Sequence, residues 1–204
     1  MKAVVGAILG CVLALSLTAC FLGSTVMTDS YANAEAYHAG DFEYRAEDVK
    51  KLEVNWYCGG VILKRAEGDM LRVTESGTGL QTEQAVHWLL TDGVLRVEFC
   101  ASGYAGRFSG QDKKLTVEIP AGLDIEVTTT SAGIAAELGK QKNVTLQTTS
   151  GTIEVSGETE AEALCLGTTS GAIGVEHLTA ESLSADTTSG SVRVLDVSVT
   201  DSIR

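Results

Sequence analysis

Hydrophobic and polar residues alternate on both sides of a short polar corner in the segment Asn143–Gly157. Val144 and Leu146 alternate with polar residues before the corner, and Ile153 and Val155 do the same after it. An alternation of period two places one side of a segment in a core and the other in solvent, which is typical of a β-strand. The pattern therefore predicts two short strands that meet at the corner.

The corner, with the sequence TTSG, recurs at nearly constant spacing. Exact copies begin at Thr148, Thr168 and Thr187, and a variant, TTSAG, begins at Thr129. Successive copies start 19 or 20 residues apart. Regular recurrence with this period indicates a chain built from structural repeats.

The apolar positions keep their offsets from each corner, so Ile153, Ile173 and Val192 are expected to stack in one buried ladder. Two strands and two turns fill a period of about 20 residues, and stacking the copies at roughly 4.8 Å forms parallel sheets around one core. We therefore predict an all-β parallel β-solenoid, with its repeats clearest over residues 115–200. An antiparallel sandwich is the alternative, but hairpins do not require identical offsets from copy to copy.

The corner residues are interpreted as structural rather than catalytic or binding residues. Glycine adopts backbone conformations that a Cβ forbids, and the hydroxyl groups can bond to backbone nearby or one repeat away. The corner residues assigned this role are Ser150, Gly151, Ser170, Gly171, Ser189 and Gly190.

The spacing is less regular over residues 41–110. The segment VNWYCGGVIL echoes the later corners, with Trp56 at an inward position and Cys58 where the later copies have serine. An Asp-Gly pair at Asp92–Gly93 is typical of a tight hairpin turn. We expect this half to form a mixed or antiparallel cap on the repeats, within one domain over residues 41–204.

The N-terminal segment resembles an export signal. One basic residue precedes an uncharged apolar run, which ends in LTAC at Leu17–Cys20. This resembles a bacterial lipoprotein signal, which implies a signal peptide over residues 1–19, an acylated Cys20 and a tether over residues 20–40. An ordinary signal peptide is the alternative. The lipoprotein interpretation places the domain outside the cytoplasmic membrane, anchored to it by lipid.

The net charge of −12 argues against nucleic acid as a partner, because an acidic surface repels phosphate. Lone histidines, and an acidic turn with Glu158, Glu160 and Glu162, show no spacing typical of catalytic or metal sites. We therefore expect no cofactor, no metal and no catalytic residue.

Three segments together resemble the bacterial putative adhesin family of β-solenoid domains, in the DUF4097 group. They are KKLEVNWYCGGVIL, LTVEIPAGLDIEV and the repeated TTSG followed by an apolar residue. The resemblance covers residues from about 41 to the end. It implies an exported or membrane-attached domain with an adhesin-like role, and it brings no catalytic residues. Cys58 departs from the usual corner serine.

Three cysteines fall within the domain. Cys165 lies at an outward position, and Cys58 and Cys100 both lie in the irregular half, where they can form one disulfide or remain unpaired. Metal-type spacing such as CxxC is absent from the sequence.

Two classes of function fit these observations. The first is a non-catalytic envelope module that binds or scaffolds an unidentified envelope protein or glycan, or forms the outer part of an envelope-sensing system. The second is a glycan-active solenoid enzyme, which would need paired carboxylates in a groove. No acidic pair recurs at a fixed offset in the repeats, so the module is the favoured prediction. The sequence predicts neither the oligomeric state nor a protective cap at the C-terminal end of the repeats.

Overall fold

The computed structural model describes residues 30–106 and 113–204. The predicted signal peptide, the predicted lipid attachment at Cys20 and most of the predicted tether lie outside the described residues. The elements are η1 (Ala34–Ala36), β1 (His38–Ala39), β2 (Phe42–Arg45), η2 (Ala46–Asp48), β3 (Lys51–Trp56), β4 (Gly60–Arg65), β5 (Met70–Ser76), η3 (Thr82–Gln84), β6 (His87–Thr91), β7 (Val94–Glu98), β8 (Lys114–Ile119), β9 (Asp124–Thr129), β10 (Gly133–Glu137), β11 (Gly139–Lys140), β12 (Asn143–Thr148), β13 (Ile153–Val155), β14 (Thr159–Thr168), β15 (Ile173–Thr187) and β16 (Val192–Ile203).

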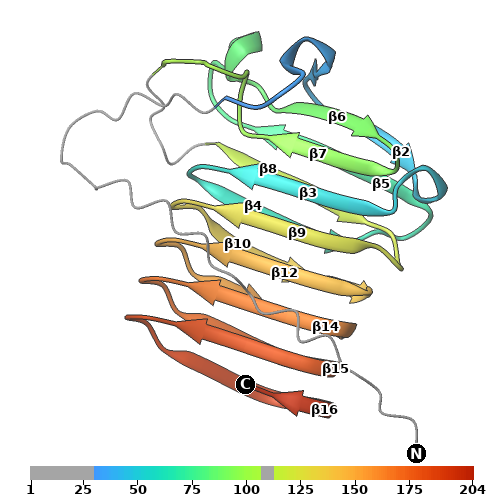
Figure 1. The fold of residues 1–204 in the computed structure, drawn as a ribbon, viewed down its shortest axis with the longest axis vertical. Coiled ribbons are helices and arrows are strands. Elements are labelled where there is room, and N and C mark those ends of the chain that lie inside the picture. The colour runs from blue at the N-terminus through green and yellow to red at the C-terminus, as the bar shows by residue number, and fades with distance from the viewer. Residues whose placement is uncertain (1–29, 107–112) are drawn as a thin grey trace, which may run out of the picture.

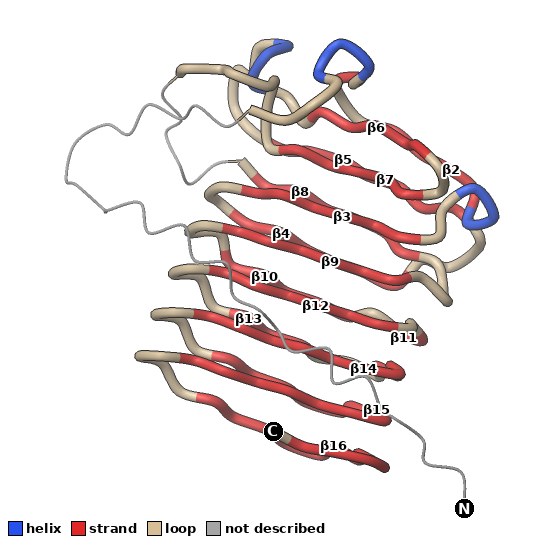
Figure 2. The backbone as a smooth tube through the Cα atoms, viewed as in Figure 1, coloured by secondary structure: helices blue, strands red, loops and turns tan. Residues whose placement is uncertain are grey.

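The described strands join into one large, mixed and mostly parallel sheet, which confirms the all-β prediction (Figure 1). The long strands β14, β15 and β16 bend, so each contributes to more than one side of a stack of strands. Among the described residues, the short helical turns lie at the N-terminal end of the stack (Figure 2). In the part of the chain that the structure describes, no helix has both the length and the apolar character needed to cross a membrane.

The repeats stack in parallel and in register. We call each strand–corner–strand unit a rung. On one side of the stack Ile134 pairs with Ile153, Ile153 with Ile173, and Ile173 with Val192. On the other side β9, β12 and β14 pair in parallel, with each first threonine of the corner opposite the next. These pairings overturn the antiparallel sandwich as an account of the repeats.

The ladder of apolar residues is buried except at its last position. Ile153 and Ile173 are 0% and 1% exposed, whereas Val192 is 43% exposed. The register of the predicted ladder is confirmed, but the predicted burial of Val192 is wrong. Strand β16 is paired with β15, and no second strand among the described residues pairs with it.

The N-terminal half combines both pairing directions, as predicted. The pairs β1–β6, β2–β5, β5–β8 and β6–β7 are antiparallel. The hairpin β6–β7 turns at Asp92 and Gly93, whose φ angles of 54° and 80° confirm the predicted tight turn.

Chain order and spatial order differ at the junction between the two halves. Strand β3 lies between β7 and β9, and β4 lies between β8 and β10, all in parallel (Figure 1). The rung 51–65 is therefore inserted between strands that come much later in the chain. Its Trp56 is opposite Thr129, so the predicted echo of the later corners is present in the structure.

The folded part of the chain begins before Asp41. Tyr31 donates a hydrogen bond from its backbone amide to Ser102 and another from its hydroxyl to the Cys100 carbonyl. Strand β1 pairs with β6, and the Trp88 indole donates to the Gly40 carbonyl. The C-terminal part of the predicted tether is thus packed on the domain, because its aromatic and backbone groups find partners there.

Candidate functional site

The TTSG corners are held by their first threonine. The Thr168 hydroxyl accepts a hydrogen bond from the Gly171 amide at 3.0 Å and donates to the Gly151 carbonyl of the previous rung at 3.3 Å. Thr148 and Thr187 accept from the glycine three residues later in the same way, each at 3.0 Å. The hydroxyl group thus closes its own corner and ties it to the rung before.

The corner glycines are required for close stacking. A β-carbon on Gly171 would lie 1.7 Å from the carbonyl oxygen of Gly151, and one on Gly190 would lie 1.7 Å from that of Gly171. Neither glycine, nor Gly151, has a positive φ. Glycine is required here by the close approach of neighbouring backbones, and not by the unusual backbone conformation that the sequence led us to expect.

The corner serines have a smaller part in this arrangement. Ser150, Ser170 and Ser189 are exposed, and their backbone amides donate to carbonyls of the adjacent rung. The side-chain hydrogen bonds that close the corners come from threonine. Serine at this position therefore presents a hydroxyl group at the edge of the stack.

A buried ion pair lies in the N-terminal half. The Nζ of Lys113 is 2.8 Å from Oε1 of Glu75, and the two side chains are 4% and 5% exposed. Lys113 also donates to the backbone carbonyls of Gln84 and Phe99. The ammonium therefore faces one carboxylate and two backbone carbonyls.

Aromatic rings surround the same ammonium. Nζ of Lys113 lies 4.1 Å from the centre of the Phe99 ring and 5.0 Å from that of Trp56. Burial lowers the pKa of Lys113, while the hydrogen bond and the charge of Glu75 act in the opposite direction. The cluster joins β5, η3 and the end of β7, so its role is structural.

Cys58 and Cys100 are buried near this cluster, and both are close enough to Lys113 to influence its pKa. Burial raises the pKa of the Cys58 thiol, and the positive charge of Lys113 partly opposes that shift. The structure contains Cys58 as a thiol. A disulfide between Cys58 and Cys100 stays a prediction.

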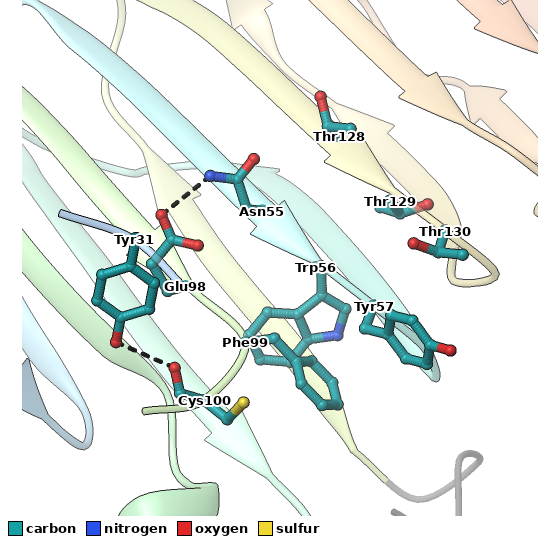
Figure 3. A pocket seen from close by; sticks show the side chains of 10 residues that line it. All are labelled: Tyr31, Asn55, Trp56, Tyr57, Glu98, Phe99, Cys100, Thr128, Thr129 and Thr130. Atoms are coloured by element: carbon teal, nitrogen blue, oxygen red, sulfur yellow. Dashed lines mark hydrogen bonds between the residues drawn. The ribbon is translucent and has the colours of Figure 1, made fainter. Parts of the chain in front are cut away.

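A pocket opens beside this cluster and is named here the Tyr31 pocket. It has a volume of about 120 Å³ and is formed by the ends of β3, β7 and β9 together with Tyr31 (Figure 3). Its lining residues are Tyr31, Asn55, Trp56, Tyr57, Glu98, Phe99, Cys100, Thr128, Thr129 and Thr130.

Among the described residues that line the Tyr31 pocket, Glu98 is the one with a charged side chain. It is 6% exposed, and its Oε1 accepts a hydrogen bond from the Asn55 side-chain amide at 2.9 Å. Figure 3 shows its carboxylate between Asn55 and the ring of Tyr31. Burial raises the pKa of Tyr31, and the charge of Glu98 raises it further. The pocket therefore combines a desolvated negative charge with aromatic walls.

One donor in the wall of this pocket is unsatisfied. Trp56 is 3% exposed, and its indole N–H is buried without a hydrogen-bond partner among the described residues. Trp56 lies in the core, as predicted from its inward position. Since buried polar groups are nearly always paired, this donor is an exception among the described core residues.

Four carboxylates on the outer side of the strands are held in ion pairs, within a strand or between neighbouring strands. Lys51 lies 2.8 Å from Glu53 and 2.7 Å from Glu126, and Arg96 also contacts Glu53, at 3.1 Å. On β5, Arg72 bridges carboxylates of both neighbouring strands, Glu43 and Glu118, at 3.2 Å each. Each of these four acidic groups therefore faces at least one cation.

The other residues singled out in the sequence do not gather into a site. Cys165 is half-buried on the outer side of β14, as expected from its outward position. Glu160 in the acidic turn is exposed and pairs with Lys140 at 3.2 Å. The described residues contain no group of three or more acidic, cysteine or histidine side chains arranged to hold a metal ion.

Sequence reasoning missed the Tyr31 pocket and the Lys113 cluster. Tyr31 contacts residues about 70 positions later in the chain, and Glu98 meets Asn55 across 43 positions. Neither separation follows the repeat period. The signals available in the sequence were an aromatic residue within the expected tether and an acidic residue at the apolar end of a strand.

Matches among solved structures include two bacterial proteins. A putative cell adhesion protein from Clostridium sporogenes has 9% identity, covering 81% of this chain and 98% of that chain, with a TM-score of 0.41. A putative adhesin from Bacteroides fragilis has 11% identity, covering 80% and 96%, with a TM-score of 0.32. No curated protein matches the chain.

A family model matches most of the folded chain. It is described as Toastrack DUF4097, and it matches residues 42–203. The match spans the N-terminal cap and every stacked rung. The chain therefore belongs to the toastrack DUF4097 family.

Proposed function

We propose that this protein is a non-catalytic module of the bacterial cell envelope, anchored by lipid at Cys20, with an adhesin-like binding or scaffolding role. In this proposal the in-register rungs form a parallel β-solenoid that holds a binding surface outside the membrane. The domain organisation is a signal over residues 1–19, a tether and the solenoid domain.

The observation that carries the non-catalytic role is that four outer carboxylates are engaged in ion pairs with lysine or arginine. Glu53 and Glu126 share Lys51, and Glu43 and Glu118 share Arg72. A glycosidase needs one protonated acid and one free carboxylate across a groove. The carboxylates in these pairs face cations rather than a second acid across a groove.

The anchor is tested by expressing the full chain in a bacterial host and measuring the mass of its N-terminal peptide. We expect an acylated Cys20 and recovery with the membrane fraction, and we expect a Cys20→Ala variant to lose both. Cys165→Ala is the matched cysteine control and should behave as the wild type. An unmodified Cys20 on a membrane-free protein would contradict the anchor.

The binding role is tested by capture from envelope extracts on the immobilised full chain. We expect one saturable protein or glycan ligand, bound equally by a variant in which Ser150, Ser170 and Ser189 are replaced by alanine. These serines are exposed, and the corners are closed by threonine and glycine, so the variant should remain folded. Release of shortened glycan by the wild type would instead favour an enzyme.

A further inference from the structure

We propose that the open edge of strand β16 binds the same edge of a second copy of this chain, so that two molecules join end to end. The inference rests on the proposed binding role and names the partner as the protein itself. It is built on an uncovered part of the core, the backbone groups along β16, the charge of the last described rung and the closed state of the opposite end.

The apolar core is open at β16. Ile173 and Val175 are 1% and 0% exposed, because the next rung covers them. Their partners in β16, Val192 and Val194, are 43% and 41% exposed. Further along the same strand, Ile203 is 68% exposed. A surface of this kind resembles a core cut across, which is typical of permanent interfaces between protein chains.

The backbone of β16 presents hydrogen-bonding groups at this edge. The Ile173 amide donates to the Ser191 carbonyl at 2.8 Å, so this group of Ser191 faces β15. Alternate residues of a parallel strand direct their amide and carbonyl groups to opposite sides, so Val192 and Val194 direct theirs away from β15. No second strand among the described residues pairs with β16. The partner that satisfies this backbone and covers the apolar side chains is another β-strand.

A second copy of β16 meets both requirements. It brings the same row of apolar side chains and the same backbone edge, and a two-fold axis lets each copy cover the other. Strands related by such an axis run antiparallel, which is the more stable of the two pairings. In this arrangement Val192 and Val194 reach the burial of the rungs before them.

The charge of the last described rung permits this contact. The whole chain has a net charge of −12, so two copies repel each other over most of their surfaces. Residues 188–204 instead carry two arginines and two aspartates, so their side-chain charges balance. These residues are Arg193, Arg204, Asp196 and Asp201. The β16 end is therefore a neutral region on an acidic molecule.

The opposite end of the stack is closed, which limits the assembly to two copies (Figure 1). Strand β1 has two residues, and β2 exposes the charged side chains of Glu43 and Arg45. Short edge strands with charged side chains resist the addition of a further strand. A longer row of copies needs both ends open, so we expect a closed pair.

The pair would hold the proposed lipid anchors apart. Tyr31 bonds to Ser102 and Cys100 near the closed end, and Cys20 lies 11 positions before Tyr31 in the sequence. Two copies joined through β16 therefore carry their anchors toward opposite ends of the pair, an arrangement that can connect two membranes. The adhesin-like role would then be recognition of the protein by itself.

The test measures the molecular mass of the lipidated full chain by sedimentation equilibrium in density-matched detergent. We expect a monomer–dimer equilibrium that depends on protein concentration, without larger species. Vesicles of phosphatidylcholine that carry the protein on their outer surface should cluster, as measured by light scattering.

Val194→Lys places a charge in the uncovered core and should weaken dimerisation by about tenfold or more, because a lysine on an edge strand opposes strand addition. Ala39→Lys is the matched control, since it places the same charge on exposed β1 and should leave dimerisation within about twofold of the wild type. Ile203→Lys, at a more exposed position of β16, should weaken dimerisation by several-fold and provides a second variant if Val194→Lys unfolds.

A chain that stays monomeric, or a dimer that both β16 variants leave unchanged, would overturn the inference. Equal weakening by Ala39→Lys would also overturn it, because the opposite end would then take part. A monomeric chain that captures a different envelope protein would overturn the inference alone and leave the binding role intact. A monomeric chain that captures nothing would overturn the proposed function as well. Dimers in detergent without clustering of vesicles would overturn the connection of two membranes.

Discussion

The backbone of Gly171 lies so close to Gly151 that a β-carbon on Gly171 would come within 1.7 Å of the Gly151 carbonyl oxygen. The two glycines belong to consecutive rungs, and both are buried. Their approach sets how closely the corners can stack. The TTSG repeat is therefore a packing requirement that recurs at each rung.

Gly171→Ala should destabilise the domain by about 1–3 kcal/mol or more, because one rung must move away from the next to admit the methyl group. Urea unfolding of the two proteins measures the difference. Gly68→Ala is the matched control, since a β-carbon there meets nothing within 4 Å and the residue has an ordinary φ. Equal loss of stability in both variants would contradict the steric account.

Thr168→Val should cost about 1–3 kcal/mol, because it leaves the Gly171 amide and the Gly151 carbonyl without the partner they share. Valine keeps the shape of threonine, so packing changes little. Ser170→Ala, at the exposed position of the same corner, should change stability by less than about 0.5 kcal/mol. If thermal unfolding shows a larger loss of stability for Ser170→Ala than for Thr168→Val, then the threonine hydroxyl does not supply the hydrogen bonds that close the corner.

Lys113→Met should destabilise the domain by about 3–5 kcal/mol, since it leaves Glu75 as a buried charge without its cation. Lys51→Met removes a more exposed lysine that also pairs with carboxylates, and it should cost no more than about 1 kcal/mol. Denaturant unfolding measures both. A Lys113→Met protein as stable as the wild type would show that the pair is dispensable.

Cys58 should make the domain less stable in alkaline solution. Burial raises the pKa of its thiol, so the folded state keeps a proton that the unfolded state loses above pH of about 8.5. Stability therefore falls as the pH rises through this value. In reducing buffer, Cys58→Ala should lose less stability than the wild type between about pH 7.5 and pH 9.5. Cys165→Ala should keep the wild-type pH dependence, and a wild-type slope in Cys58→Ala would contradict the prediction.

The stacked repeats could be predicted because their signal is local and periodic. Ile153 and Ile173 have the same offset from their corners, and the structure pairs them directly. The exposure of Val192 could not be predicted, since it depends on what lies beside β16 rather than on the pattern within it. The reason for glycine at the corners could not be predicted either. Close approach of two backbones and a positive φ both favour glycine, so the sequence does not distinguish them.

The candidate site could not be predicted, because it is assembled by contacts that have no period. Glu98 reads in the sequence as the polar end of strand β7, yet it is buried against Asn55 of another strand. The sequence places Lys113 beside a second lysine, in a pattern typical of the surface. In the structure its ammonium is enclosed by the Glu75 carboxylate and the carbonyls of Gln84 and Phe99. A lysine or glutamate within a polar run carries no local sign of such burial.

The rung 51–65 meets its neighbours late during synthesis of the chain. Its β3 needs β7 and β9, and its β4 needs β8 and β10, so both sides are covered only after residue 137 has emerged. Contacts of this kind slow folding, because a long loop must close before they form. The later rungs can each add to the one just completed. Until residue 137 is available, the strand edges of rung 51–65 are open to pairing with other chains, which makes this interval the period of greatest risk of misassembly during folding.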